Sequence, residues 1–145
     1  MQRLARPLAP TCLLLAVATL AVSACGSSNS SSPTAPTPAA TTQSFSETLP
    51  QLGSVTHPFT VSAMGPVEIE LTTVAPLATL ALGVGIGTWN DTSCVSTIAQ
   101  NDNARSGVVA LRGTAAAGNY CIRVYDSGNV PEATAVTYTV QVVHP

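Results

Sequence analysis

Two histidines and one pair of glutamates are the residues whose side chains could support catalysis. His57 precedes Pro58 at the expected start of a strand, and His144 is the penultimate residue. Neither histidine lies beside a serine that it could activate, and the sequence has no Gly-x-Ser-x-Gly turn. We therefore expect both side chains to be solvated, although distant residues can also assemble a triad in space.

Glu68 and Glu70 lie two residues apart, so both side chains would point to the same face of a strand. Paired carboxylates can divide the roles of general acid and general base. The same spacing is more typical of the solvent-facing side of an amphipathic strand, and we favour this interpretation. The sequence thus predicts no catalytic residue and no enzyme. The alternative is a small hydrolase that uses His57 with a serine, or the two glutamates.

Two segments rich in asparagine and aspartate could supply oxygen ligands to a hard cation, namely Asn90-Asp91-Thr92 and Asn101-Asp102-Asn103. Such segments more commonly form Asx turns at strand ends, so we predict no metal and no other cofactor. Trp89 lies beside the first segment, and its ring could stack on a sugar, although a single tryptophan is commonly a core residue. The candidate binding residues are Trp89, Asn90, Asp91, Tyr120 and Tyr125.

Alternating residue patterns indicate the elements that must position these side chains. Val67, Ile69 and Leu71 share one face of an extended chain, and the two glutamates share the other. The same period of two occurs over residues 80–86, 120–125 and 136–142, and weaker strands are expected over residues 45–49, 57–62, 93–99 and 107–111. The sequence therefore predicts an all-β fold, a single antiparallel β-sandwich or jelly roll of seven or eight strands.

Glycines and turn residues add detail to this prediction. Gly83, Gly85 and Gly87 alternate with apolar residues, which leaves one face of their strand bare. We expect a neighbouring backbone or an aromatic ring to lie close against that face. Turns are predicted where polar turn residues cluster, notably at residues 90–91, 101–103 and 127–129.

A family resemblance follows from the order of these parts. Residues 118–125 read Gly-x-Tyr-x-x-Arg-Val-Tyr, preceded by Phe59-Thr60-Val61 and residues 67–71 and followed by Tyr138-Thr139-Val140. Over residues 45–143 this order resembles the pre-peptidase C-terminal domain. The resemblance implies a β-sandwich that acts as an accessory module without catalytic activity. In that family the central strand tends to carry aspartates, whereas here residues 78–90 contain no acid, so no calcium or substrate role is transferred.

The N-terminal residues have the pattern of a secretory signal. Arg3 and Arg6 precede an apolar segment over residues 13–24. As a helix this segment would span about 18 Å, well short of the roughly 30 Å hydrocarbon layer of a bilayer. It therefore indicates a cleaved signal over residues 1–24 and not a permanent membrane span.

Val22-Ser23-Ala24-Cys25 resembles the lipobox of bacterial lipoprotein precursors. The resemblance implies that Cys25 receives a diacylglycerol on its thiol and that cleavage follows Ala24. An ordinary secretory leader with a chance cysteine is the alternative. We expect the protein to be anchored through this lipid to a membrane of the bacterial cell envelope, facing the periplasm or the exterior.

The remaining chain divides into a linker and one domain. Residues 25–42 are rich in serine, threonine and proline, which predicts a disordered stalk, and residues 43–145 are enough for a single core. Lysine is absent, and in the predicted mature chain three arginines stand against seven acidic residues. This acidic balance argues against a nucleic-acid partner, which would require a basic surface.

Cys94 and Cys121 are the two cysteines left once Cys12 is removed with the leader and Cys25 is modified. An exported pair of this kind is expected to form a disulfide, whereas a metal pair would need further ligands nearby. Together these observations predict a lipid-anchored envelope protein with a non-catalytic β-sandwich that binds a polysaccharide or protein ligand. A carbohydrate-binding module is the more specific alternative.

Overall fold

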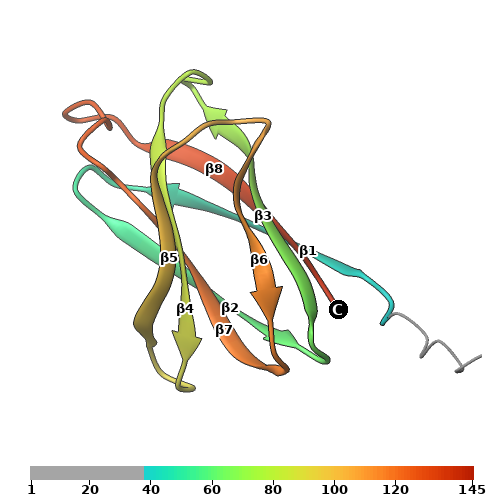
Figure 1. Ribbon diagram of the computed structural model, residues 1–145. Coiled ribbons are helices and arrows are strands. Elements are labelled where there is room, and N and C mark those ends of the chain that lie inside the picture. The colour runs from blue at the N-terminus through green and yellow to red at the C-terminus, as the bar shows by residue number, and fades with distance from the viewer. Residues whose placement is uncertain (1–37) are drawn as a thin grey trace, which may run out of the picture. The chain divides into compact units, whose positions relative to one another are not determined.

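The computed structural model describes residues 38–145, which form eight β-strands (Figure 1). The predicted signal, the lipid site at Cys25 and most of the predicted linker lie outside the described residues. The strands are β1 (Thr41–Leu49), β2 (Ser54–Val61), β3 (Gly65–Ala75), β4 (Leu82–Trp89), β5 (Cys94–Ala104), β6 (Val108–Ala115), β7 (Gly118–Tyr125) and β8 (Val136–His144). No helix able to cross a membrane occurs within residues 38–145.

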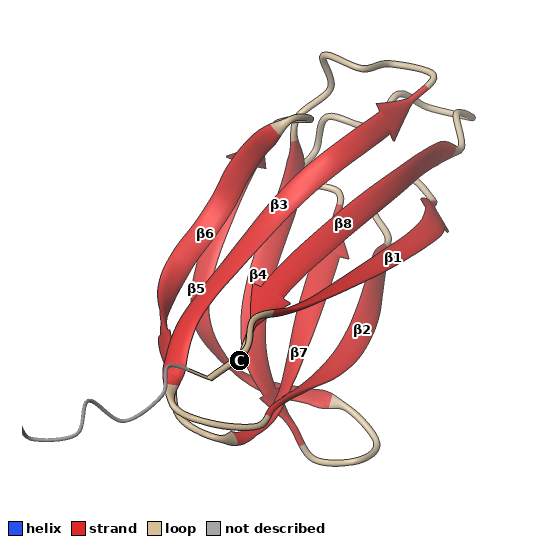
Figure 2. Ribbon diagram, turned by 90° about the vertical axis from the view of Figure 1, so that its right-hand side faces the viewer, coloured by secondary structure: helices blue, strands red, loops and turns tan. Residues whose placement is uncertain are grey.

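The strands form two four-stranded antiparallel sheets that pack face to face (Figure 2). One sheet has the order β1-β8-β3-β6 and the other β2-β7-β4-β5. Only the β4–β5 hairpin joins neighbours of one sheet, and every other connection passes between the sheets. This is the order of a jelly roll, so the predicted fold class is confirmed.

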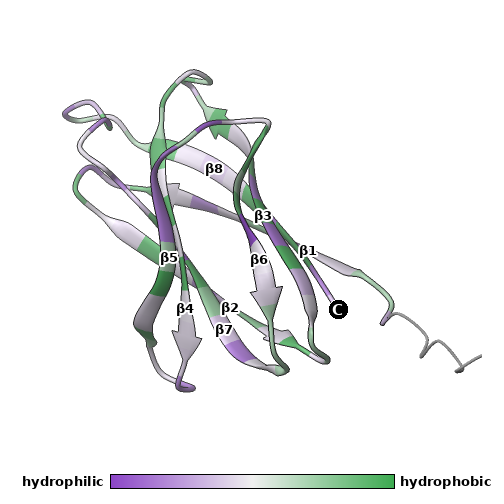
Figure 3. Cartoon of the chain, viewed as in Figure 1, coloured by the Kyte–Doolittle hydropathy of each residue, from purple (hydrophilic) through white to green (hydrophobic). Residues whose placement is uncertain are grey.

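The core follows from the period of two that the strands carry. In β8, residues Val136, Tyr138, Val140 and Val142 are buried, while the residues between them are partly or fully exposed. β3 buries Val67, Ile69 and Leu71 in the same way, and its glutamates lie on the outer face, as predicted. Figure 3 shows hydrophobic and hydrophilic residues alternating along the strands. The two inner faces meet in one continuous apolar cluster.

Several strand boundaries differ from the sequence-based expectation, and two of the differences have a clear physical reason. β1 begins at Thr41, inside the segment predicted as linker, because Thr41 and Thr42 pair with the end of β8. The turn predicted at residues 101–103 is wrong, since β5 continues to Ala104. There the amide side chain of Asn101 accepts a hydrogen bond from the Asn103 N–H (2.9 Å) and donates one to the Ala110 carbonyl (3.1 Å). Asn101 thus forms the side-chain to backbone hydrogen bond that is typical of an Asx turn, but it does so within the edge strand β5.

The row of glycines in β4 allows close contacts, as expected. A methyl group on Gly83 would fall on the ring of Tyr125, which lies directly over this position. On Gly87 it would lie 2.9 Å from the Val95 carbonyl oxygen and 3.1 Å from the Cys94 sulfur, both tighter than ordinary contacts. At Gly85 the nearest atom would be 3.6 Å away, an ordinary van der Waals distance.

The predicted disulfide between Cys94 and Cys121 is confirmed, with 5.7 Å between the two Cα atoms. It joins the first residue of the edge strand β5 to the central strand β7, although β4 lies between them in the sheet. The bond passes over β4 at Gly87, which pairs with Cys121. Because Gly87 has no side chain, the start of β5 can approach β7 closely.

Asp126 holds together the loops at one end of the sandwich, a role that the sequence did not predict. Its carboxylate accepts hydrogen bonds from the backbone N–H groups of Leu52, Gly128, Asn129 and Val130 at 2.8–3.0 Å. Desolvation tends to raise the pKa of Asp126, but these hydrogen bonds together outweigh it and hold the pKa below its usual value. The charge thus stabilises the connections before β2 and after β7.

Candidate functional site

The residues predicted to form a carbohydrate site do not come together. Tyr120 pairs with Thr88, near the β4–β5 hairpin that carries Trp89, whereas Tyr125 pairs with Gly83 at the other end of the same strands. The two tyrosines are thus about 17 Å apart along β7. They also face opposite ways, because Tyr120 shares the side of the buried Ile122, and Tyr125 shares the side of the exposed Arg123.

The polar residues of the β4–β5 hairpin form hydrogen bonds with one another. The Asn90 side-chain oxygen accepts hydrogen bonds from the N–H groups of Thr92 (3.2 Å) and Ser93 (2.8 Å), and from both of their hydroxyl groups. This is the Asx turn that the sequence predicts. Asp91 is exposed and has a left-handed backbone with a φ of 72°. Within residues 38–145 no group of three or more histidine, cysteine or acidic side chains could hold a metal ion.

Tyr125 is committed to contacts within its own sheet. Its hydroxyl group donates a hydrogen bond to the Asp102 carboxylate, and the Arg123 guanidinium carbon lies 5.0 Å from the centre of its ring. Burial, and then the hydrogen bond and charge of Asp102, raise the pKa of Tyr125 to about 12. The ring therefore covers Gly83 of β4 and does not present a free stacking surface.

Both histidines are buried, so the expectation that they are solvated is wrong. His57 is 8% exposed, shares a 2.7 Å hydrogen bond with the Tyr138 hydroxyl, and stacks on Phe45 with 4.8 Å between the ring centres. His144 is 3% exposed and packs against Phe59. The sequence did indicate this burial, because His57 lies on the same face of its strand as the apolar Phe59 and Val61. His144 likewise continues the buried positions of β8.

We expect the stability of the domain to fall as the pH drops below about 6.5, the usual pKa of histidine. Desolvation lowers the pKa of His57 in the folded state, and the charge of Glu47 opposes this only partly. The unfolded chain therefore binds a proton more readily, and protonation favours unfolding. Urea unfolding at pH 7.5 and pH 5.0 would measure the loss.

The matched variant for this measurement is His57→Gln, which removes the titrating group and keeps a polar side chain. Its stability should depend less on pH over the same interval, while His144 and Asp126 remain in both proteins. Equal pH dependence in the wild type and the variant would contradict the assignment to His57.

The two glutamates do not form an isolated carboxylate pair. Glu68 lies 2.9 Å from the Arg112 guanidinium on the neighbouring strand β6, and both side chains are well exposed. An exposed ion pair of this kind contributes little to stability. The solvent-facing interpretation of Glu68 and Glu70 agrees with this arrangement.

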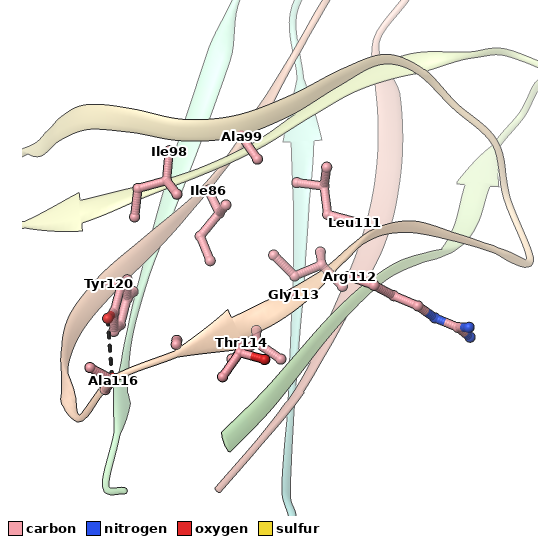
Figure 4. Close-up of a pocket in the computed structure, with 12 residues that line it drawn as sticks. Ile86, Ile98, Ala99, Leu111, Arg112, Gly113, Thr114, Ala116 and Tyr120 are labelled. Carbon is pink, nitrogen blue, oxygen red and sulfur yellow. Dashed lines mark hydrogen bonds between the residues drawn. The ribbon is translucent and has the colours of Figure 1, made fainter. Parts of the chain in front are cut away.

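An apolar pocket of about 280 Å³ lies between the edge strands β5 and β6 (Figure 4). β5 ends one sheet and β6 ends the other, so the pocket opens at one side of the sandwich. Figure 4 shows Ile86, Ile98 and Leu111 around the space, whereas Arg112 extends away from it. The lining residues are Val67, Ile69, Ile86, Ile98, Ala99, Leu111, Arg112, Gly113, Thr114, Ala115, Ala116 and Tyr120.

Small residues on β6 account for the pocket. Gly113 and Ala115 occupy the inward-facing positions that follow Leu111, opposite Val67 and Gly65 of β3. A methyl group added to Gly113 would meet no atom within 4 Å, so the missing side chain leaves open space. On the other wall, Ile98 of β5 is 57% exposed at the rim. The core is thus incompletely filled along this edge.

The pocket offers few polar groups to a ligand. The hydroxyl group of Tyr120 donates a hydrogen bond to the Ala116 carbonyl oxygen (3.1 Å), which is also a lining residue. The ring of Tyr120 packs against Phe59 of β2, at 5.9 Å between ring centres. An apolar group therefore suits the space better than a sugar or an ion. Of the five predicted binding residues, only Tyr120 lines this pocket.

Comparisons with known proteins show a similarity of fold to a solved structure. No protein-family model and no curated protein matches the sequence. The structure is similar to the pre-peptidase C-terminal domain of a collagenase from Bacillus anthracis, with 16% sequence identity and a TM-score of 0.47. The similarity covers 69% of this chain and 87% of that one. The resemblance of residues 118–125 to the pre-peptidase C-terminal domain is a prediction from the sequence.

Proposed function

We propose that this protein is anchored to a membrane of the bacterial cell envelope by a lipid on Cys25, and that its jelly roll is a non-catalytic binding module. The observation that carries the binding role is the apolar pocket open between β5 and β6. A stable monomeric domain normally fills such a space with its own side chains. An unfilled pocket beside two exposed strand edges therefore supports a role in holding a ligand.

The non-catalytic part of the proposal is supported by the positions of the histidines. The Nε2 atom of His57 is hydrogen-bonded to the Tyr138 hydroxyl group in the core, and the ring of Phe45 stacks on one face of the imidazole ring. A general base must reach the proton that it removes, within hydrogen-bond distance or through one water. A hydrolase built on His57 would have to open this core first.

The anchoring part of the proposal predicts that Cys25→Ser abolishes labelling of the protein by a fatty-acid analogue in bacterial cells. The thiol is the group that would carry the diacylglycerol, and serine cannot replace it. Gel electrophoresis with in-gel detection of the label would measure the loss, and the variant should appear either as an uncleaved precursor or as a soluble product.

Cys12→Ser is the matched control, since Cys12 lies within the predicted signal and is discarded with it. This variant should keep full labelling. Absence of label from the wild-type protein, together with unchanged membrane fractionation of Cys25→Ser, would contradict lipid anchoring at Cys25.

A further inference from the structure

We propose that β6 is a site of strand addition, at which an extended peptide of another protein pairs with the β6 backbone and places an apolar side chain in the pocket. This inference rests on the proposed binding role and names its ligand. Within residues 38–145, β6 pairs only with β3, so its other edge presents backbone N–H and C=O groups, although the Ala110 carbonyl oxygen of β6 already accepts a hydrogen bond from the Asn101 side chain. Peptides commonly use such edges, with main-chain hydrogen bonds giving affinity and side-chain pockets giving specificity.

The other three sheet edges are less suited to this role. β2 contains Pro58, which has no N–H group to donate. β5 is interrupted by several register shifts against β4, and Ser96 has a left-handed φ of 48°. At β1, the inner side is already filled by the stack of Phe45 on His57. β6 has eight residues without proline or left-handed backbone and only one register shift against β3, and Val108 at its start is 56% exposed.

The pocket lies where an added strand would need it. Neighbouring strands are about 4.8 Å apart, and alternate side chains of an added strand would point inward beside Gly113 and Ala115. An apolar cavity of about 150 Å³ can hold a benzene molecule. The space of about 280 Å³ therefore has room for one large apolar side chain, such as leucine or phenylalanine.

The charges near β6 indicate what the outer face of the added strand should carry. Arg112 pairs with Glu68, but Glu70 on the same face of the sheet has no ion-pair partner among the described residues. The described domain has three arginines against seven acidic residues. A strand that alternates apolar residues facing inward with lysine or arginine facing outward complements both the apolar pocket and the acidic surface. An acyl chain would fill the pocket but would leave the strand edge unpaired.

The test uses the mature protein in detergent and a synthetic nine-residue peptide that alternates leucine with lysine. We expect the peptide to bind and to slow amide hydrogen exchange across β6. A peptide of the same sequence with N-methyl groups along one edge should bind at least tenfold more weakly, because it cannot pair with a strand. Backbone amide signals in NMR spectra would report both effects.

Gly113→Leu is the variant that closes the pocket. It fills open space, so the protein should be at least as stable as the wild type, while peptide affinity should fall at least tenfold. Gly85→Ala, which adds a methyl group on the outer face of the other sheet, is the matched control and should bind normally. If Gly113→Leu does not fold, Ala99→Leu fills the same space from β5.

Three results would overturn the inference. Equal binding of the N-methylated peptide would exclude strand pairing. Binding of oleate but not of the peptide, lost in Gly113→Leu, would assign the pocket to an acyl chain. Dimerisation that Gly113→Leu abolishes would assign the edge to a second copy of this chain. Absence of lipid label from the wild-type protein would refute the anchoring proposal alone, because the binding of the peptide to β6 does not depend on the lipid.

Discussion

Replacing Cys94 and Cys121 together with alanine is expected to lower the free energy of unfolding by about 3.5 kcal/mol. The two residues are 27 positions apart, and their bond restricts the unfolded chain over that loop. The double replacement avoids leaving one unpaired thiol in the variant. Urea unfolding followed by circular dichroism would measure the change, since a two-state domain of this size gives one transition.

The reduced wild-type protein is the control for this experiment. It should unfold at nearly the same urea concentration as the alanine variant, because both lack the same covalent link. A difference of less than 1 kcal/mol between the oxidised wild type and the variant would contradict the expected role of the disulfide. Hydrogen exchange should also rise most at the first residues of β5, where the bond holds this edge strand against the centre of its sheet.

The disulfide also bears on the proposed binding edge. Ile98 and Ala99, which line one wall of the pocket, follow Cys94 by only a few residues on the same strand. β5 is an edge strand with several register shifts, so backbone pairing alone holds it weakly. We infer that the bond fixes the distance between the two walls. The alanine variant should therefore bind the test peptide more weakly, even under conditions in which it is folded.

The strands could be predicted because each one is buried on a single face. Val67, Ile69 and Leu71 alternate with polar residues, and this period fixes both the strand and the face that it buries. The glycine face of β4 follows from the same alternation of residues. The sequence does not show, however, that the ring covering Gly83 belongs to Tyr125. That contact depends on which strand lies next to β4, which local patterns do not determine.

The pocket could not be predicted from the sequence. Gly113 is an ordinary glycine in a strand until the strand order places β6 at an edge, facing another edge strand. The predicted sugar-binding residues failed to come together for a related reason. Tyr120 and Tyr125 are close in sequence, but the pleat directs them to opposite faces. The prediction of solvated histidines is wrong because it follows residue type alone, whereas the alternation of buried and exposed residues in β2 and β8 indicates that both side chains are buried.

Gly87→Ala is expected to destabilise the domain by about 1 to 3 kcal/mol, the usual range for an extra methyl group forced into a packed site. The new methyl group would press on the carbonyl oxygens of Val95 and Ser96 and on the Cys94 sulfur, at 2.9–3.1 Å. These atoms belong to backbone or to the disulfide, so they cannot move aside as the end of a flexible side chain would. Urea unfolding would measure the loss.

Gly85→Ala is the control on the same face of β4, because its methyl group would lie 3.6 Å from the nearest atom. It should be neutral or slightly stabilising, since alanine restricts the unfolded chain more than glycine does. In the background without the disulfide, Gly87→Ala should destabilise the domain less, because the start of β5 is then free to move away. An equal effect in both backgrounds would show that the disulfide does not hold β5 over Gly87.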